Sequence, residues 1–327
     1  MTREPIIGPN PSNREEWLAA RRQLITATDI ARIMRNDGFT VYHEKKGDLP
    51  EFAGNRATRR GNRFQKPTLE EYAEEANAHV FDGLPLLIDP DCPALAATPD
   101  AMAVGPLVSG TPGVSTLSPN EIPSLIALQD SYGVEAKTTL SPKVSAELAE
   151  GEEGSDVVPA DWQWQTQTQM AVVGWEFVDV AILLFGKLKV RRIQRHPVLV
   201  DKCREIATEY ADRIARNLEP PMFPDSEANQ DALKSIFAPA AGVEIDLSPE
   251  NAELWARRQA AASNESAAKK AKEACDAEMR LLFGNAEIGR LPDGGMIRLG
   301  VVQCAERIQP AYAYSRFYYS KPKKGKA

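Results

Sequence analysis

The segment YGVEAKTT at residues 132–139 constrains the fold most, because it places two charged side chains inside an otherwise apolar, strand-like run. Glu135 and Lys137 are two residues apart, so on a β-strand both side chains point to the same face of the sheet. Charged groups in apolar surroundings are costly unless they have partners. Asp100 follows Pro99 in a turn within another strand-like stretch, residues 85–104. The pattern predicts that Asp100, Glu135 and Lys137 converge at the ends of adjacent strands.

These three residues have the chemistry of a metal-dependent phosphodiesterase. Two carboxylates are what a hard cation such as Mg²⁺ prefers, with water and a substrate phosphate completing its coordination. The metal would polarise the phosphate and acidify a bound water, while a lysine would orient or deprotonate that water and offset developing charge. A Pro-Asp turn and a surface Glu–Lys pair are the structural alternative, because the pattern is short and degenerate.

The rest of the chain predicts an α/β (α+β) protein with a central, mixed and twisted sheet flanked by helices. We expect helices over about 12–23, 26–34, 56–77, 159–174 and 196–220, and strands within 85–104, 132–139, 177–186 and 188–195. Pro67 lacks a backbone donor, so we expect a kink or a boundary near Lys66. The Gly-, Pro- and Ser-rich residues 105–130 are expected to form a surface excursion.

Composition changes after about residue 225. Residues 248–285 are rich in Ala, Glu and Lys and predict a long helix or a helical hairpin that ends at Gly284. A short strand-like piece follows, and the basic tail KPKKGKA is expected to be disordered. We therefore predict a core domain over 1–225 and a mainly helical C-terminal appendage over 226–327.

Charge and cysteine usage narrow the class of protein. The formal net charge of −7 argues mildly against a nucleic-acid partner, but residues 55–66 and 186–195 are two dense basic runs. Each run alone is read as a solvated face, whereas two runs flanking an acidic site favour DNA. Four scattered cysteines argue against zinc, and no apolar run is long enough for a membrane span or a signal peptide. We expect a cytoplasmic protein that does not contact membranes.

Five segments, in order, resemble one nuclease family. WLAARRQLITATDI has the spacing W-x3-R-x4-[ST]-x-[ST], and RRGNRFQKPTLEEY resembles the family's G-x3-E helix. ATPDAM and VEAKTT resemble its aspartate and E-x-K segments, and PADWQWQTQTQMAVVGW resembles its glutamine-rich helix. Over about residues 12–220 the chain resembles the YqaJ-like viral recombinases, the phage-type alkaline exonucleases that include lambda exonuclease, within the PD-(D/E)XK superfamily.

The resemblance implies a function and a set of site residues. The fold would be a PD-(D/E)XK, restriction-endonuclease-like core, and the activity Mg²⁺-dependent (or Mn²⁺-dependent) 5′→3′ digestion of one strand of linear double-stranded DNA. It also implies a homotrimer and a phage single-strand annealing protein that takes up the 3′ single strand. Asp100 and Glu135 would bind metal, Lys137 would orient or activate water, and Gln165 would support the site with Gln167 beside it. DNA and its 5′-phosphate would contact Arg21, Thr26, Thr28, Thr98, Arg60 and Arg63.

The chain departs from the family pattern in three places. Gln65 stands four residues after Gly61, where the family carries a glutamate that helps to bind metal. A neutral amide is a poorer Mg²⁺ ligand, so we expect weakened or abolished hydrolysis, whether Gln65 is natural or an introduced Glu→Gln substitution. The separation of Asp100 from Glu135 is long, and Trp162 replaces the usual tyrosine.

Two other functions remain open at this stage. A PD-(D/E)XK endonuclease of restriction or repair type would cut circular as well as linear DNA. A catalytically impaired DNA-end-binding scaffold, made plausible by Gln65, would bind ends without hydrolysing them.

Overall fold

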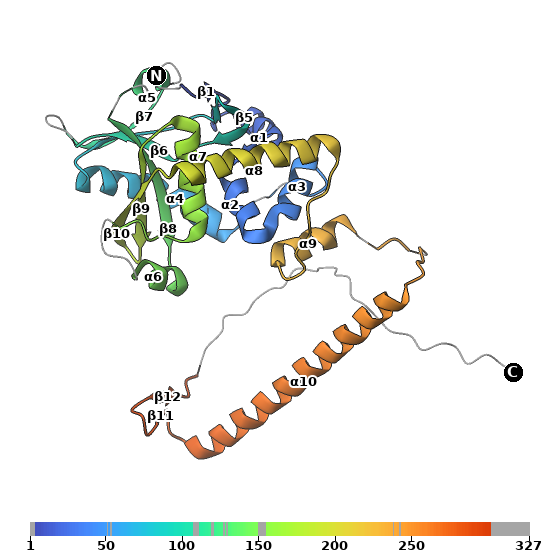
Figure 1. Cartoon of the computed structure of the whole chain (residues 1–327). Helices are drawn as coiled ribbons and strands as arrows, with labels where there is room; N and C mark the ends of the chain where they lie inside the picture. The colour runs from blue at the N-terminus through green and yellow to red at the C-terminus, as the bar shows by residue number, and fades with distance from the viewer. Residues whose placement is uncertain are drawn as a thin grey trace. The chain divides into compact units, whose positions relative to one another are not determined.

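The computed structural model describes residues 4–50, 52, 54–106, 111–118, 121–126, 128, 130–149, 155–237, 239–241 and 243–301. The chain divides into two compact units, Met1–Phe237 and Ala238–Ala327 (Figure 1). Among the helices of the described part, none combines the length and the apolar composition that a membrane crossing requires.

A mixed six-stranded sheet forms the centre of the first unit. Its strand order is β10-β9-β8-β6-β3-β7, in which β9 runs parallel to β8 and β3 runs parallel to β7, while the other neighbours are antiparallel. The strands are β3 (His79–Asp82), β6 (Ala101–Val104), β7 (Gly113–Thr116), β8 (Ser131–Thr139), β9 (Phe177–Leu184) and β10 (Lys187–Gln194).

A smaller four-stranded sheet joins the N-terminal segment to the strand that precedes Asp100. Its order is β1-β4-β5-β2, formed by β1 (Ile6–Ile7), β2 (Ile25–Thr26), β4 (Leu87–Asp89) and β5 (Cys92–Ala97). The parallel pair of Ile25 with Leu95 and of Thr26 with Ala96 fixes the segment that follows Arg21 beside β5. Asp100 lies in the turn between β5 and β6.

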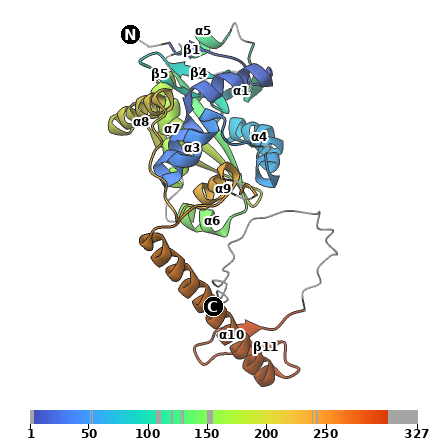
Figure 2. The same ribbon diagram turned by 90° about the vertical axis from the view of Figure 1, so that its right-hand side faces the viewer.

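Helices cover both faces of the large sheet, as the sequence predicts (Figure 2). In the first unit they are α1 (Arg14–Gln23), α2 (Ala27–Arg32), the π-helix η1 (Ile33–Asp37), α3 (Gly38–Lys46), α4 (Arg56–Glu75), α5 (Ile122–Ile126), α6 (Pro142–Ala149), α7 (Ala160–Val173), α8 (Pro197–Arg216) and α9 (Glu227–Ile236). One buried cluster joins α7 and α8 to one face, and another joins α4 to the opposite face. The mixed α/β fold class is therefore confirmed.

Strand β8 alternates between these two faces. Tyr132 and Val134 belong to the cluster with α4, whereas Glu135 and Lys137 lie on the side of α7. Gly133 also lies on the α7 side, where a Cβ atom would stand 2.6 Å from the Trp175 ring. Only glycine allows this approach, so the period of two delivers the charged pair to the space between β8 and α7.

A buried polar network holds α4 against the sheet. The Tyr72 hydroxyl donates to Asp179 Oδ2 at 2.6 Å, and Arg192 donates to both oxygens of that carboxylate at 2.8 Å. Burial and the neighbouring Asp179 charge raise the pKa of Tyr72, so its hydroxyl stays protonated and available as a donor. The network fixes α4 two turns beyond Gln65.

Two expectations about local structure need correction. Helix α4 continues through Pro67, so there is no helix boundary near Lys66. The Thr68 hydroxyl donates to the Phe64 carbonyl at 2.7 Å beside the missing proline donor, and the buried Leu69 and Tyr72 hold the second half of the helix. The excursion after residue 105 is also partly structural, because β7 pairs with β3 and the Ile122 side chain is fully buried.

The basic run at 186–195 does not form one solvated face. Lys187 is exposed, but Arg191 is buried at 2% exposure and donates to the carbonyl of Leu148 at 3.1 Å. Lys187, Lys189 and Arg191 occupy alternate positions of β10 and so share one face of the strand. Helix α6 covers the end of that face, so Arg191 is a structural residue and the surface there is less basic than expected.

The second unit consists, in its described part, of α10 (Pro249–Phe283) and the hairpin β11 (Ile288–Arg290) with β12 (Met296–Arg298). Helix α10 is a single helix of 35 residues that ends at Gly284, and none of its residues is buried. The unit boundary falls after Phe237 rather than at 225, because α9 packs on α3 through a hydrogen bond from Thr40 to Asn229 at 2.9 Å.

Candidate functional site

Asp100 lies between α4 and β8, held from both sides. The Gln65 amide donates to its Oδ1 at 2.9 Å, and the Ala136 backbone amide donates to its Oδ2 at 2.9 Å. Gln65 is half-buried and lies on the face of α4 that carries Leu69 and Tyr72. The structure thus brings the family's G-x3-E position and the aspartate together.

Glu135 is buried at 2% exposure and is held by three donors. Lys137 Nζ and Gln165 Nε2 each donate to its Oε1 at 2.6 Å, and Gln169 Nε2 donates to its Oε2 at 2.6 Å. Lys137 also donates to Gln165 Oε1 at 2.8 Å, which closes a ring of contacts between β8 and α7. The four predicted catalytic residues, Asp100, Glu135, Lys137 and Gln165, therefore lie in one neighbourhood.

The electrostatics of this cluster are those of a crowded, desolvated site. Burial and, next, the Glu135 charge raise the pKa of Asp100 to about 8, although Lys137 and the Ala136 amide oppose the shift. Burial acts to lower the pKa of Lys137, but the charges of Glu135 and Asp100 outweigh it, so that pKa is raised. One ammonium thus stands beside two carboxyl groups, and a further cation near Asp100 would favour the ionised form of that carboxyl group.

The donor set fits a divalent cation of the Mg²⁺ type, but incompletely. Asp100 and Glu135 offer carboxylate oxygens, and the Gln65 amide could offer its oxygen only by turning away from its present bond to Asp100. Among the described residues there is no group of three His, Cys, Asp or Glu side chains that could hold a metal ion. In the family pattern described above, the position of Gln65 carries a glutamate, which would be a third acid.

A second polar cluster forms where β2 meets α2. The Arg21 guanidinium lies 3.5 Å from Thr26 Oγ1 and 4.4 Å from the centre of the Trp17 ring. Thr26 caps α2 through Asp29, whose Oδ2 accepts from the Thr26 amide at 2.8 Å and from its hydroxyl at 2.7 Å. Lys45 on α3 forms an ion pair with Asp29 at 2.6 Å.

This second cluster is tied to the first through the turn that carries Asp100. The Trp17 indole donates to Thr98 Oγ1 at 3.2 Å, two residues before Asp100. Thr28 is exposed on the first turn of α2, and its side chain has no contact with Arg21 among those that the structure gives. Arg21, Thr26 and Thr98 thus belong to one connected neighbourhood, and Thr28 lies at its exposed rim.

Arg60 and Arg63 are not brought to the carboxylates. They lie on α4 at about 140° and 160° from Gln65 around the helix axis, so they project from the opposite side. Arg60 is half-buried and Arg63 is exposed. Any contact that these two make with DNA is therefore separate from the cluster of Asp100, Glu135 and Lys137.

Sequence reasoning missed part of the glutamine arrangement. Gln167, expected beside the site, instead donates to the Gln194 carbonyl at 2.7 Å and accepts from the His196 amide at 2.9 Å. Gln169 takes the place beside Glu135. The i,i+4 spacing of Gln165 and Gln169 was the available signal, because residues four apart share a helix face. Asp29 and Lys45 gave no comparable signal, since their pairing joins two separate helices.

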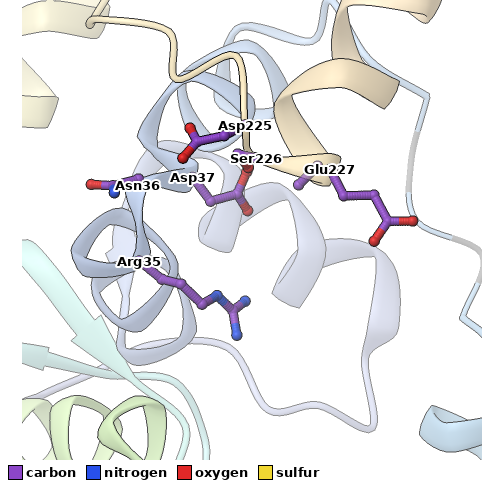
Figure 3. Close-up of a pocket in the computed structure, with 7 residues that line it drawn as sticks. Arg35, Asn36, Asp37, Asp225, Ser226 and Glu227 are labelled. Carbon is purple, nitrogen blue, oxygen red and sulfur yellow. The ribbon is translucent and has the colours of Figure 1, made fainter. Parts of the chain in front are cut away.

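The structure also has a cavity of about 420 Å³ away from the carboxylates, between η1 and the start of α9 (Figure 3). Asp37, Asp225 and Glu227 make its lining acidic. Asp37 is buried and already forms an ion pair with Arg32 at 2.7 Å. Nothing in this cavity duplicates the donor set around Asp100, so the cluster at β8 remains the candidate site.

Comparison with known proteins shows which family the chain resembles. Residues 16–176 match the family model of the YqaJ-like viral recombinase domain. A crystal structure of an alkaline exonuclease from Laribacter hongkongensis is similar, with 20% identity, a TM-score of 0.46, and coverage of 63% of this chain and 94% of that one. A phage-related exonuclease from Haemophilus somnus 129PT shows 15% identity and a TM-score of 0.34, covering 65% and 92%. No curated protein matches significantly. Because both TM-scores are below 0.5, we draw no conclusion about individual residues from these structures. The family assignment rests on the match of residues 16–176.

Proposed function

Because residues 16–176 of this chain belong to the YqaJ-like viral recombinase family, we propose that the protein is a metal-dependent DNA exonuclease. It would digest one strand of linear double-stranded DNA from the 5′ end and leave a 3′ single strand. The observation that carries this proposal is the cluster of Asp100, Glu135 and Lys137 between α4 and α7. These are the residue types that phosphodiester hydrolysis requires.

Each residue of the cluster has a defined task in this proposal. Asp100 and Glu135 hold the cation, which when bound polarises the scissile phosphate and acidifies a water. Lys137, positioned by Glu135 and Gln165, directs its ammonium toward the attacked phosphate and offsets the charge that develops there. Gln165 and Gln169 fix the Glu135 carboxylate from the side of α7.

The cluster around Arg21 is the proposed receptor for the 5′-phosphate. A guanidinium fork suits a terminal phosphate, and the hydroxyls of Thr26 and Thr28 supply further donors. The Trp17–Thr98 hydrogen bond joins this cluster to the Asp100 turn, which supports a common task for the two clusters. Arg60 and Arg63 would contact DNA outside the metal site.

Metal identity and partners rest on the family resemblance. Mg²⁺ is the proposed ion, with Mn²⁺ as a substitute, since both accept carboxylate oxygens. The proposed assembly is a homotrimer, and the proposed protein partner is a phage single-strand annealing protein that binds the 3′ strand.

A second candidate function is favoured by one specific observation. Gln65 is neutral, and its amide donates a hydrogen bond to Asp100. A carboxylate at position 65 would instead complete a metal site. A chain of this kind could bind DNA ends and hydrolyse them slowly or not at all. It would then act as an end-binding scaffold.

One experiment separates these functions. The protein and its Gln65→Glu variant are each incubated with Mg²⁺ and a linear duplex that carries a 5′-phosphate, and with closed circular DNA as the control. We expect nucleotide release from linear DNA only, faster for Gln65→Glu. End binding without hydrolysis by either protein would establish the scaffold, and cleavage of the circle would establish an endonuclease.

A further inference from the structure

The outward face of α4 carries a row of cations that have no ion-pair partner among the residues that the structure describes. The five are Arg56, Arg59, Arg60, Arg63 and Lys66, and none forms an ion pair or a side-chain hydrogen bond with another residue in the described part of the chain. Four of them are exposed and Arg60 is half-buried. At about 100° per residue, all five fall within an arc of roughly 120°. We call this face the α4 stripe.

The α4 stripe and the metal site use opposite sides of one helix. Gln65, Leu69 and Tyr72 share the inner side, where Leu69 and Tyr72 are buried against the sheet and Gln65 contacts Asp100. The stripe therefore begins within one turn of a residue of the candidate site and extends away from it toward the helix start at Arg56.

Helix α8 shows that this chain pairs helical cations elsewhere. It has 20 residues, as α4 has, and it neutralises its surface arginines in place. Arg213 pairs with Glu209 at 2.8 Å, and Arg216 pairs with Asp212 at 3.1 Å. In α4 the acidic residues come only after Pro67, so every charged residue in the first half of the helix is a cation.

The position of the stripe disfavours the helix that carries it. Arg56 and Arg59 occupy the first turn, where the helix dipole is positive, and that turn contains no acidic residue. The five cations also repel one another at i,i+3 and i,i+4 spacings. These repulsions destabilise α4 in the isolated protein. A polyanion bound along the helix would offset them.

We propose that the α4 stripe binds the phosphate backbone of the DNA substrate beside the site of hydrolysis. The choice of DNA as the polyanion rests on the proposed function. Ten residues separate Arg56 from Lys66, about 15 Å along the helix, which matches roughly four phosphates of one strand at 3.4 Å of duplex axis each. On a chain of net charge −7, this local excess of positive charge gives the complementarity that such binding requires.

The test measures binding without hydrolysis. The full chain is titrated into a fluorescein-labelled, 5′-phosphorylated duplex of about 20 base pairs in EDTA, and anisotropy is followed between about 50 and 200 mM KCl. We expect Arg56→Gln/Arg59→Gln to lower affinity by about tenfold or more and to reduce the salt slope by about two. The control Arg213→Gln/Arg216→Gln, on α8, should change neither quantity.

Two further measurements separate lost contacts from a damaged fold. Removing cations from the positive end of α4 should leave the melting temperature unchanged or raise it, and Arg56→Lys/Arg59→Lys should restore most of the salt slope. Unchanged affinity and slope in the glutamine pair, an equal loss in the α8 control, or no recovery with lysine would each overturn the proposal. This titration does not measure hydrolysis, so its result is independent of the digestion assay. If the chain binds DNA through the α4 stripe but releases no nucleotides in the digestion assay, the exonuclease is refuted and the proposal for the stripe stands.

Discussion

The Gln65 amide donates to Asp100 Oδ1 at 2.9 Å. Gln65, which departs from the family pattern, therefore still contacts Asp100, which matches it. An oxygen of Asp100 thus accepts a hydrogen bond from a neutral amide at position 65. If the cluster holds a cation, as we propose, position 65 supplies no third carboxylate to it.

Restoring the acid at position 65 should therefore strengthen metal binding. We expect Gln65→Glu to raise Mg²⁺ affinity by about tenfold or more, because ligand and near-ligand changes commonly have effects of 10–100-fold. Isothermal titration with Mg²⁺ measures this directly. Without metal the variant should melt at a lower temperature than the parent, since a third carboxylate would then repel Asp100 and Glu135. Gln259→Glu on the exposed α10 is the control, and equal affinity in all three proteins would contradict the prediction.

Gln169 should contribute to stability through its bond to Glu135. Replacement by leucine removes the donor to Oε2 of a buried carboxylate, so we expect a loss of about 1–3 kcal/mol in the free energy of unfolding. Urea denaturation without metal measures this loss. Gln163→Leu, on the same helix, is the control and should cost less.

A double-mutant cycle tests the pair itself. In a Glu135→Gln background the Gln169→Leu change should be less costly, because the charge that needed a donor is gone. Equal costs in both backgrounds would show that the Gln169–Glu135 bond adds nothing.

Periodicity predicted those parts of the site that lie on a single element. The period of two in β8 places Glu135 and Lys137 on one face, and the structure joins them at 2.6 Å. The glutamines of α7 required more than spacing. Gln165 and Gln169 share a face and Gln167 does not, but only packing determines which face meets β8.

Where the structure departs from expectation, a tertiary contact outweighs a local rule. The helix continues through Pro67 because the Thr68 hydroxyl bonds back to the Phe64 carbonyl across it and because Leu69 is buried against the sheet. Arg191 alternates with lysines as a surface residue would, yet α6 buries it. The sequence pattern of one helix or strand does not show which other element will pack against it.

The ion pair of Asp29 with Lys45 should make the cluster around Arg21 and Thr26 sensitive to acid. Burial acts to raise the pKa of Asp29, but Lys45 and the Thr26 hydrogen bonds outweigh it, so the pKa in the folded protein is depressed. A depressed pKa adds stability that is complete above the unfolded value of about 3.9 and is lost as the pH falls through the folded value. Asp29→Asn should therefore cost about 3 kcal/mol at neutral pH and progressively less as the pH falls below about 3.9, as measured by urea unfolding at pH 7 and at pH 3.

An exposed pair provides the comparison for Asp29. Asp212 pairs with Arg216 on the surface of α8, with more than half of each side chain exposed, so Asp212→Asn should cost under about 0.5 kcal/mol at either pH. If the cost of Asp29→Asn does not shrink on acidification, its carboxylate is not ionised in the native protein and the assigned ion pair is wrong.

Thiol reactivity should report the burial of α8. Cys203 is fully buried against Thr168, and burial raises its pKa to about 11, whereas Cys275 on α10 is exposed. Because the thiolate is the reactive form, iodoacetamide near pH 8 should alkylate Cys275 within minutes and leave Cys203 intact. Peptide mapping by mass spectrometry distinguishes the two sites, and labelling in about 6 M urea serves as the control in which both react. Equal rates for Cys203 and Cys275 in the native protein would show that α8 opens from α7, and the packing that positions Gln165 and Gln169 would then be far looser than the structure indicates.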